Sequence, residues 1–138
     1  MKSWLIMATG LIGVATWLTA AGAQNAKPPT VKEIMKKVNF RDGALCPLLG
    51  RALKVDQPNW DEVQRETHQF ATLVDALGQN EPPRGDKASW QQLTKSYIAA
   101  AHELDMAAQR KDRNAALAAH AKVANPATCN GCHKVHRN

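Results

Sequence analysis

The sequence predicts an all-α protein, specifically a four-helix bundle in up-down-up-down order. Apolar residues recur at alternating spacings of three and four in four segments, the period of an amphipathic helix. No stretch of the 138 residues shows the apolar-polar alternation of a competing strand. The connections between the segments are short, so neighbouring helices are expected to pack antiparallel.

The first helical segment is expected from about Thr30 to Lys54. Asn39, Gly43 and Pro47 fall inside it and favour a kink or a short break over one continuous helix. The side chains predicted to share its apolar face are Val31, Ile34, Met35, Val38, Leu45, Leu49 and Ala52.

The second segment is expected to begin at Asn59, whose side chain can cap a helix, and to end at Gly78. The third follows a polar loop with Pro82, Pro83 and Gly85 and is capped by Asp86 or Ser89. The predicted apolar faces are Trp60, Val63, Thr67, Phe70, Val74 and Leu77 in the second, and Trp90, Leu93, Tyr97, Ala100, Leu104 and Ala107 in the third.

The fourth segment is expected to start near Asp112 or Asn114. Pro126 should kink this helix or begin a new helical turn, because proline lacks a backbone donor and crowds the preceding turn. The predicted buried positions are Leu117, Ala121, Ala124, Thr128, Cys132 and Val135.

The composition fits a single globular domain with a modest core. Hydrophobic residues make up 44% of the chain but aromatic residues only 5%, and alanine is abundant. Such side chains fill little volume, so we expect a bulky group to complete the interior.

Residues 1–23 are expected to be a secretory signal peptide. Lys2 supplies the positive start, Trp4 to Leu18 form an uncharged apolar stretch, and Ala21-Gly22-Ala23 suits cleavage. The alternative is an uncleaved anchor helix, although the apolar stretch is short for a bilayer core of roughly 30 Å. Cleavage would leave residues 24–138 as a periplasmic domain without stable membrane insertion.

Cysteine spacing near the C-terminus gives the clearest chemical signal. Cys129 and Cys132 lie one helical turn apart, and His133 follows directly. This spacing is typical of c-type haem attachment, with two thioether bonds and an axial imidazole. A structural zinc site would need four ligands, and no second pair is placed for it; a simple disulfide is the other alternative. Cys46 is expected to be a buried small side chain.

With this motif in its last helix, the chain resembles the class II c-type cytochromes, the cytochrome c-prime family. Ser89-Trp90 at the start of the third helix and Arg137, four residues after His133, extend the similarity over residues 24–138. His136 departs from the aromatic residue usual before that arginine. The resemblance implies a four-helix bundle with one haem c near the end of helix four.

The cytochrome c-prime family contains low-spin members, in which a methionine from helix one binds the iron. It also contains high-spin members, in which an apolar side chain blocks the distal face of the haem. Glu33-Ile34-Met35-Lys36 looks like the ligand-bearing helix of the low-spin members. The bundle topology also brings the start of helix one level with His133, so Met35 is expected as the distal iron ligand. His120, His102 and Met106 would lie about 18 to 25 Å from that level along their helices. His136 shares the helix of His133 and therefore cannot reach the opposite face of the haem. His68 is expected to be solvated. The alternative role for Met35 is packing in the core.

These expectations define an electron carrier rather than an enzyme, because histidine and methionine ligands leave no open position on the iron. The alternative is a five-coordinate protein that binds nitric oxide or carbon monoxide. A formal charge of +6 suggests acidic redox partners, which basic residues at the haem end would attract. The alternative is that these basic residues are scattered over the surface and solvated. No nucleic-acid partner is expected. Members of the family often dimerise through helices one and two, so a homodimer is one possible state of this protein.

Overall fold

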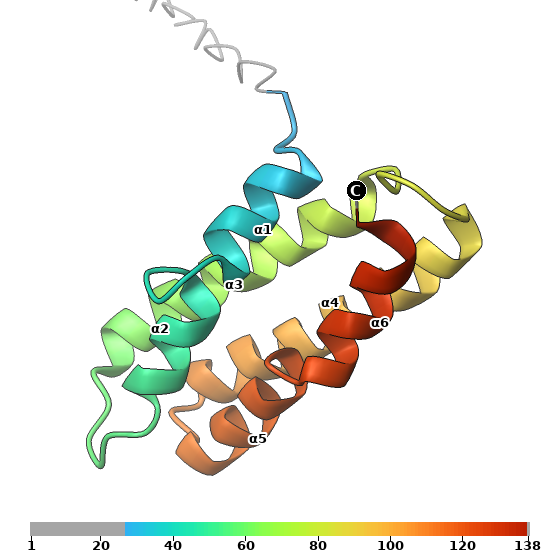
Figure 1. The fold of residues 1–138 in the computed structure, drawn as a ribbon. Coiled ribbons are helices and arrows are strands. Elements are labelled where there is room, and N and C mark those ends of the chain that lie inside the picture. The colour runs from blue at the N-terminus through green and yellow to red at the C-terminus, as the bar shows by residue number, and fades with distance from the viewer. Residues whose placement is uncertain (1–26, 138) are drawn as a thin grey trace, which may run out of the picture.

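The computed structural model describes residues 27–137, so the expected signal peptide, residues 1–23, lies outside the described part. Within this part all regular structure is α-helical, which confirms the predicted all-α class (Figure 1). The helices are α1 (Val31–Asn39), α2 (Leu45–Ala52), α3 (Trp60–Gln79), α4 (Lys87–Gln109), α5 (Arg113–Val123) and α6 (Pro126–His136).

Polar side chains cap most of these helices at their N-termini. Thr30 and Glu33 form a capping box at α1, in which each side chain binds the other residue's backbone N–H. The side chains of Asn59 and Asp86 accept from the backbone N–H groups of Glu62 and Ser89, as expected from the sequence. Asp112 caps α5 in the same way.

Both predicted breaks are present. Residues 40–44 separate α1 from α2, and Arg41 in this loop has a φ of 64°. Pro126 starts α6 as a new helix, with Asn125 as its cap. Proline suits this first position because the backbone N–H there has no partner within the helix.

One helix boundary and the expected buried face of α5 were wrong. Gly78 lies inside α3, which ends one residue later at Gln79. The glycine allows the close approach of α4, because an added Cβ would lie 2.6 Å from Ile98 Cδ1. In the alanine-rich α5, the buried residues are Ala116, Ala119 and Val123, which lie one or two positions before the expected Leu117, Ala121 and Ala124.

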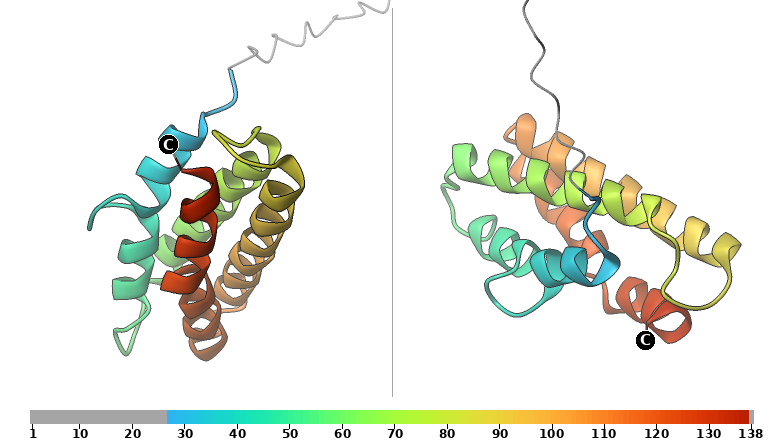
Figure 2. Two further views of the ribbon diagram at one scale, coloured as in Figure 1. Left: turned by 45° about the vertical axis from the view of Figure 1, so that its right-hand side comes forward. Right: turned by 90° about the horizontal axis from the view of Figure 1, so that it is seen from above.

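The long helices α3 and α4 pack against each other and carry the shorter ones. The helices α1 and α2 lie along α3, while α5 and α6 lie along α4 (Figures 1 and 2). Apolar residues with no exposed surface fill the centre. Burial of each large aliphatic or aromatic side chain among them stabilises the fold by about 1.5–3 kcal/mol. The largest are Phe70, Ile34, Leu49, Leu53 and Leu104. None of the helices described here is both long and apolar enough to cross a membrane.

A histidine, rather than the expected Val135, anchors the end of α6. His136 is 1% exposed, whereas Val135 is 41% exposed. The His136 ring donates from Nδ1 to the Arg84 carbonyl at 2.8 Å and accepts from Ser89 Oγ at 3.2 Å. It also meets Trp90 edge-on, with 5.3 Å between the ring centroids. The helix restarts at Pro126, so the face extrapolated from α5 does not continue into α6.

We expect Gly85→Ala to destabilise the fold by about 1–3 kcal/mol. Gly85 has a φ of 83°, and an added Cβ would lie 3.0 Å from both the Val135 carbonyl oxygen and His136 Nδ1. Urea unfolding followed by circular dichroism measures the loss. Gly43→Ala is the control, because nothing lies within 4 Å of its added Cβ. Equal stability of the two variants would contradict the prediction.

Candidate functional site

The two cysteines of the C-terminal motif lie on one side of α6. Cys129 and Cys132 are three positions apart, so their side chains are neighbours on the helix surface. Both are free thiols and half-buried, and Cys132 packs at the edge of the core. Burial, and to a smaller extent the proximity of Cys129, raises the pKa of the Cys132 thiol.

His133 follows on the same helix with an exposed side chain. Among residues 27–137 no hydrogen bond occupies its ring nitrogens, whereas its backbone carbonyl accepts from Arg137. The imidazole is therefore free to bind a metal. Two thiols at this spacing with an adjacent free imidazole are a donor set suited to covalent haem attachment.

Met35 lies on α1, a different helix from the other three predicted site residues. Its side chain is half-buried against the core, and Asn39 Nδ2 lies 4.0 Å from its sulfur. The start of α1 and the end of α6 are at the same end of the molecule (Figure 2). The structure thus groups Cys129, Cys132 and His133 on one helix and leaves Met35 on another.

The other potential iron ligands either contact acidic side chains or are exposed. His102 Nε2 lies 2.8 Å from Asp75 Oδ1, and His68 is a largely exposed side chain beside Asp105. Met106 is 52% exposed, late in α4. The solvated position expected for His68 is confirmed.

Cys46 is buried, as expected, at 5% exposure. Burial, with a smaller contribution from Cys129, raises the pKa of the Cys46 thiol to about 11. His120 Nε2 donates to the Cys46 carbonyl at 2.8 Å and lies 3.8 Å from its sulfur. His120 therefore serves to join α5 to α2, a contact that sequence spacing does not reveal.

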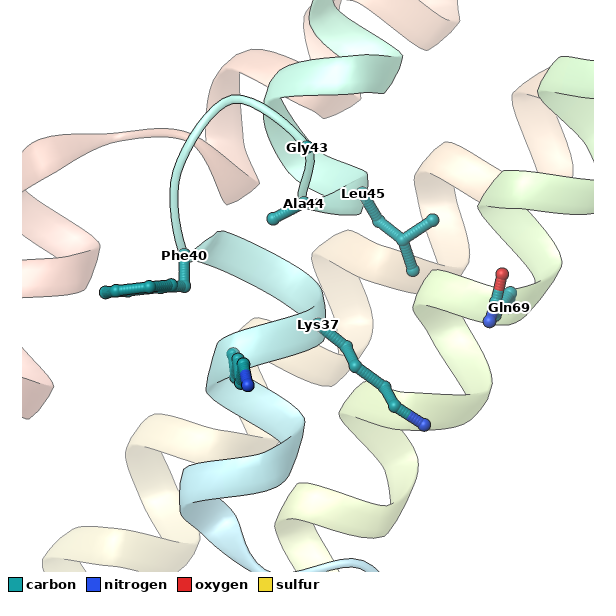
Figure 3. Close-up of a pocket in the computed structure, with 7 residues that line it drawn as sticks. Lys37, Phe40, Gly43, Ala44, Leu45 and Gln69 are labelled. Carbon is teal, nitrogen blue, oxygen red and sulfur yellow. The ribbon is translucent and has the colours of Figure 1, made fainter.

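A hollow of about 350 Å³ opens beside the loop between α1 and α2 (Figure 3). Its lining comprises Lys36, Lys37, Phe40, Gly43, Ala44, Leu45 and Gln69, without any of the cysteines or His133. Phe40 is 54% exposed, and the Arg41 guanidinium lies 4.8 Å from its ring centroid. The sequence did not indicate this hollow. Gln69 comes from α3, whereas the other lining residues come from α1, α2 and the loop between them.

Across residues 27–137 no three His, Cys, Asp or Glu side chains gather into a group that could hold a metal ion. The donor set on α6 does not depend on such a group, since a haem brings its own four nitrogen ligands. Comparison of the chain with protein-family models, curated proteins and solved structures finds no match.

Proposed function

We propose that this chain is an exported, periplasmic c-type cytochrome that carries one haem c and transfers electrons, as a member of the class II type that it resembles. One observation carries the proposal. The helix α6 holds two free thiols one turn apart, Cys129 and Cys132. The imidazole of His133 follows them directly and has no hydrogen-bond partner among residues 27–137. This is the donor arrangement that covalent haem attachment requires.

The packing of α6 supports a bulky group beside it. His136 is the one fully buried residue among the eleven of α6, and the helix contacts mainly α4. Cys129 and Cys132 are half-buried, and Cys132 packs against the edge of the core. A planar group held by both thiols would lie beside that edge.

The helix order supports a four-helix bundle with two broken members. We count α1 with α2 as the first helix and α5 with α6 as the fourth, beside the continuous α3 and α4. The first and last of these members contact each other through α2 and α5. The helices α1, which carries Met35, and α6, which carries His133, lie toward the same end of the molecule (Figure 2). A bundle interior is where such folds place a cofactor.

Two axial ligands would make the site an electron-transfer site. His133 is proposed as the proximal ligand and Met35 as the distal one. A bound haem would supply a one-electron redox couple, while the protein sets its potential through ligands and burial. With both axial positions filled, no position is left for a gas or a substrate.

Optical spectra of the purified oxidised and reduced protein test this proposal. We expect a low-spin spectrum in both states and no binding of carbon monoxide to the reduced protein. A high-spin, five-coordinate spectrum with rapid carbon monoxide binding would instead favour the gas-binding function.

The basic residues near the ends of α1 and α6 and before α4 are proposed to gather at the haem end, where they would suit an acidic redox partner. Arg84 donates to the carbonyls of Lys134 and Val135, which holds its charge beside the end of α6. Lys87 is offset by Glu81 at 2.6 Å. The basic end consists of Lys27, Lys32, Lys36, Lys37, Arg84, Lys87, Lys134 and Arg137.

We predict that electron transfer with an acidic partner slows steeply as rising salt shortens the screening length to about 8 Å. Lys36→Glu with Lys134→Glu should flatten this dependence. Stopped-flow rates at increasing ionic strength measure it.

The matched control is Lys54→Glu with Lys111→Glu, which makes the same charge change at the opposite end. That end is marked by Arg113, which donates to the Leu53 and Lys54 carbonyls. Equal salt slopes for both double variants would show that the basic end does not guide the partner.

A further inference from the structure

A hydrogen-bonded pair lies beside the sulfur of Met35. Asn39 Nδ2 lies 3.1 Å from the hydroxyl oxygen of Tyr97 and 4.0 Å from Met35 Sδ. Met35 and Asn39 are four positions apart in α1, so their side chains share one face of that helix. Tyr97 comes from the middle of α4 and joins them across the molecule.

The Tyr97 ring is held in place. It is 8% exposed and meets Phe70 edge-on, with 6.1 Å between the centroids. Burial raises the pKa of the Tyr97 phenol, so the hydroxyl keeps its proton at neutral pH. The phenol oxygen accepts from the Asn39 amide and thereby fixes the direction of that amide.

We infer that Asn39 and Tyr97 are positioning residues for the Met35 thioether, with the amide of Asn39 directed at the sulfur and the hydroxyl of Tyr97 holding that amide. The inference rests on the proposed role of Met35 as an iron ligand. A donor beside a thioether withdraws electron density from the sulfur. It therefore weakens donation to the metal and disfavours the oxidised state.

Removing either group should lower the reduction potential without removing the haem. We expect Tyr97→Phe and Asn39→Leu each to reduce the ratio of reduced to oxidised protein about three- to tenfold at a fixed ambient potential, as for the loss of one hydrogen bond. A tenfold change corresponds to about 59 mV for one electron. Redox titration followed by absorbance measures the shift.

The double variant sharpens the test. Because the two groups act through one chain of contacts, Tyr97→Phe with Asn39→Leu should shift the potential no further than either single change. In a Met35→Ala background, Tyr97→Phe should leave the potential where it was, because its effect passes through the sulfur.

Thr94→Val is the matched control. Thr94 lies one turn earlier in α4, is 3% exposed, and donates its hydroxyl to the Trp90 carbonyl at 2.8 Å. Its loss removes a buried hydroxyl from the same helix without touching Asn39. The inference would be overturned if Tyr97→Phe and Asn39→Leu had the same reduction potential as Thr94→Val. Low-spin spectra in all three variants would show that Met35 still binds the iron. A five-coordinate wild-type protein would overturn both proposals.

Discussion

An exported chain with Cys129→Ala and Cys132→Ala is expected to carry no covalent haem and to yield little folded protein. The core is rich in alanine, and α6 has His136 as its one fully buried residue. A group that binds the folded state and not the unfolded one adds its binding free energy to stability. Haem staining after denaturing electrophoresis and circular dichroism of the soluble fraction measure the two losses.

Cys46→Ala is the control, because it removes a buried thiol that is not part of the attachment motif. We expect it to keep the haem and most of the helical signal, at a modest cost in stability. Wild-type helicity in the variant without Cys129 and Cys132 would refute the coupling of haem to folding.

Met35→Ala is expected to keep the covalent haem and to open the sixth coordination position. Alanine has no donor atom in its side chain, so the iron should change from low spin to high spin. The reduced protein should then bind carbon monoxide. Absorption spectra before and after addition of the gas measure both changes.

Met106→Ala is the matched control for this variant. Met106 is 52% exposed and lies late in α4, so its loss should leave the spectrum unchanged. A Met35→Ala spectrum identical to that of the wild type would remove Met35 as the ligand.

Local signals made much of the fold predictable. Asn39, Gly43 and Pro47 predicted the break between α1 and α2, and Pro126 predicted the start of α6. Asn59 predicted the cap of α3. Each of these signals acts through its own backbone or a near neighbour, so no knowledge of the tertiary structure was needed.

Positions that depend on packing between helices were not predictable in this way. In α5 the alanine repeat gives little contrast between faces, and the expected buried face was wrong. Gly78 has the chemistry of a helix end but serves the close approach of Ile98.

The same limit applies to the candidate site. The spacing of Cys129, Cys132 and His133 is visible in the sequence, because all three lie on one helix. The contact between Asn39 and Tyr97 joins residues 58 positions apart, and the burial of His136 depends on Arg84 and Ser89 from another part of the chain. No periodicity within a single segment indicates such pairs.

Mass spectrometry of the intact protein, purified after expression in a host that exports and matures c-type cytochromes, tests the central claim most directly. We predict the mass of the chain from Gln24 onward plus one haem, with the added mass on the peptide that contains Cys129 and Cys132. A chain mass without haem, with both thiols free or joined to each other, would contradict the proposal.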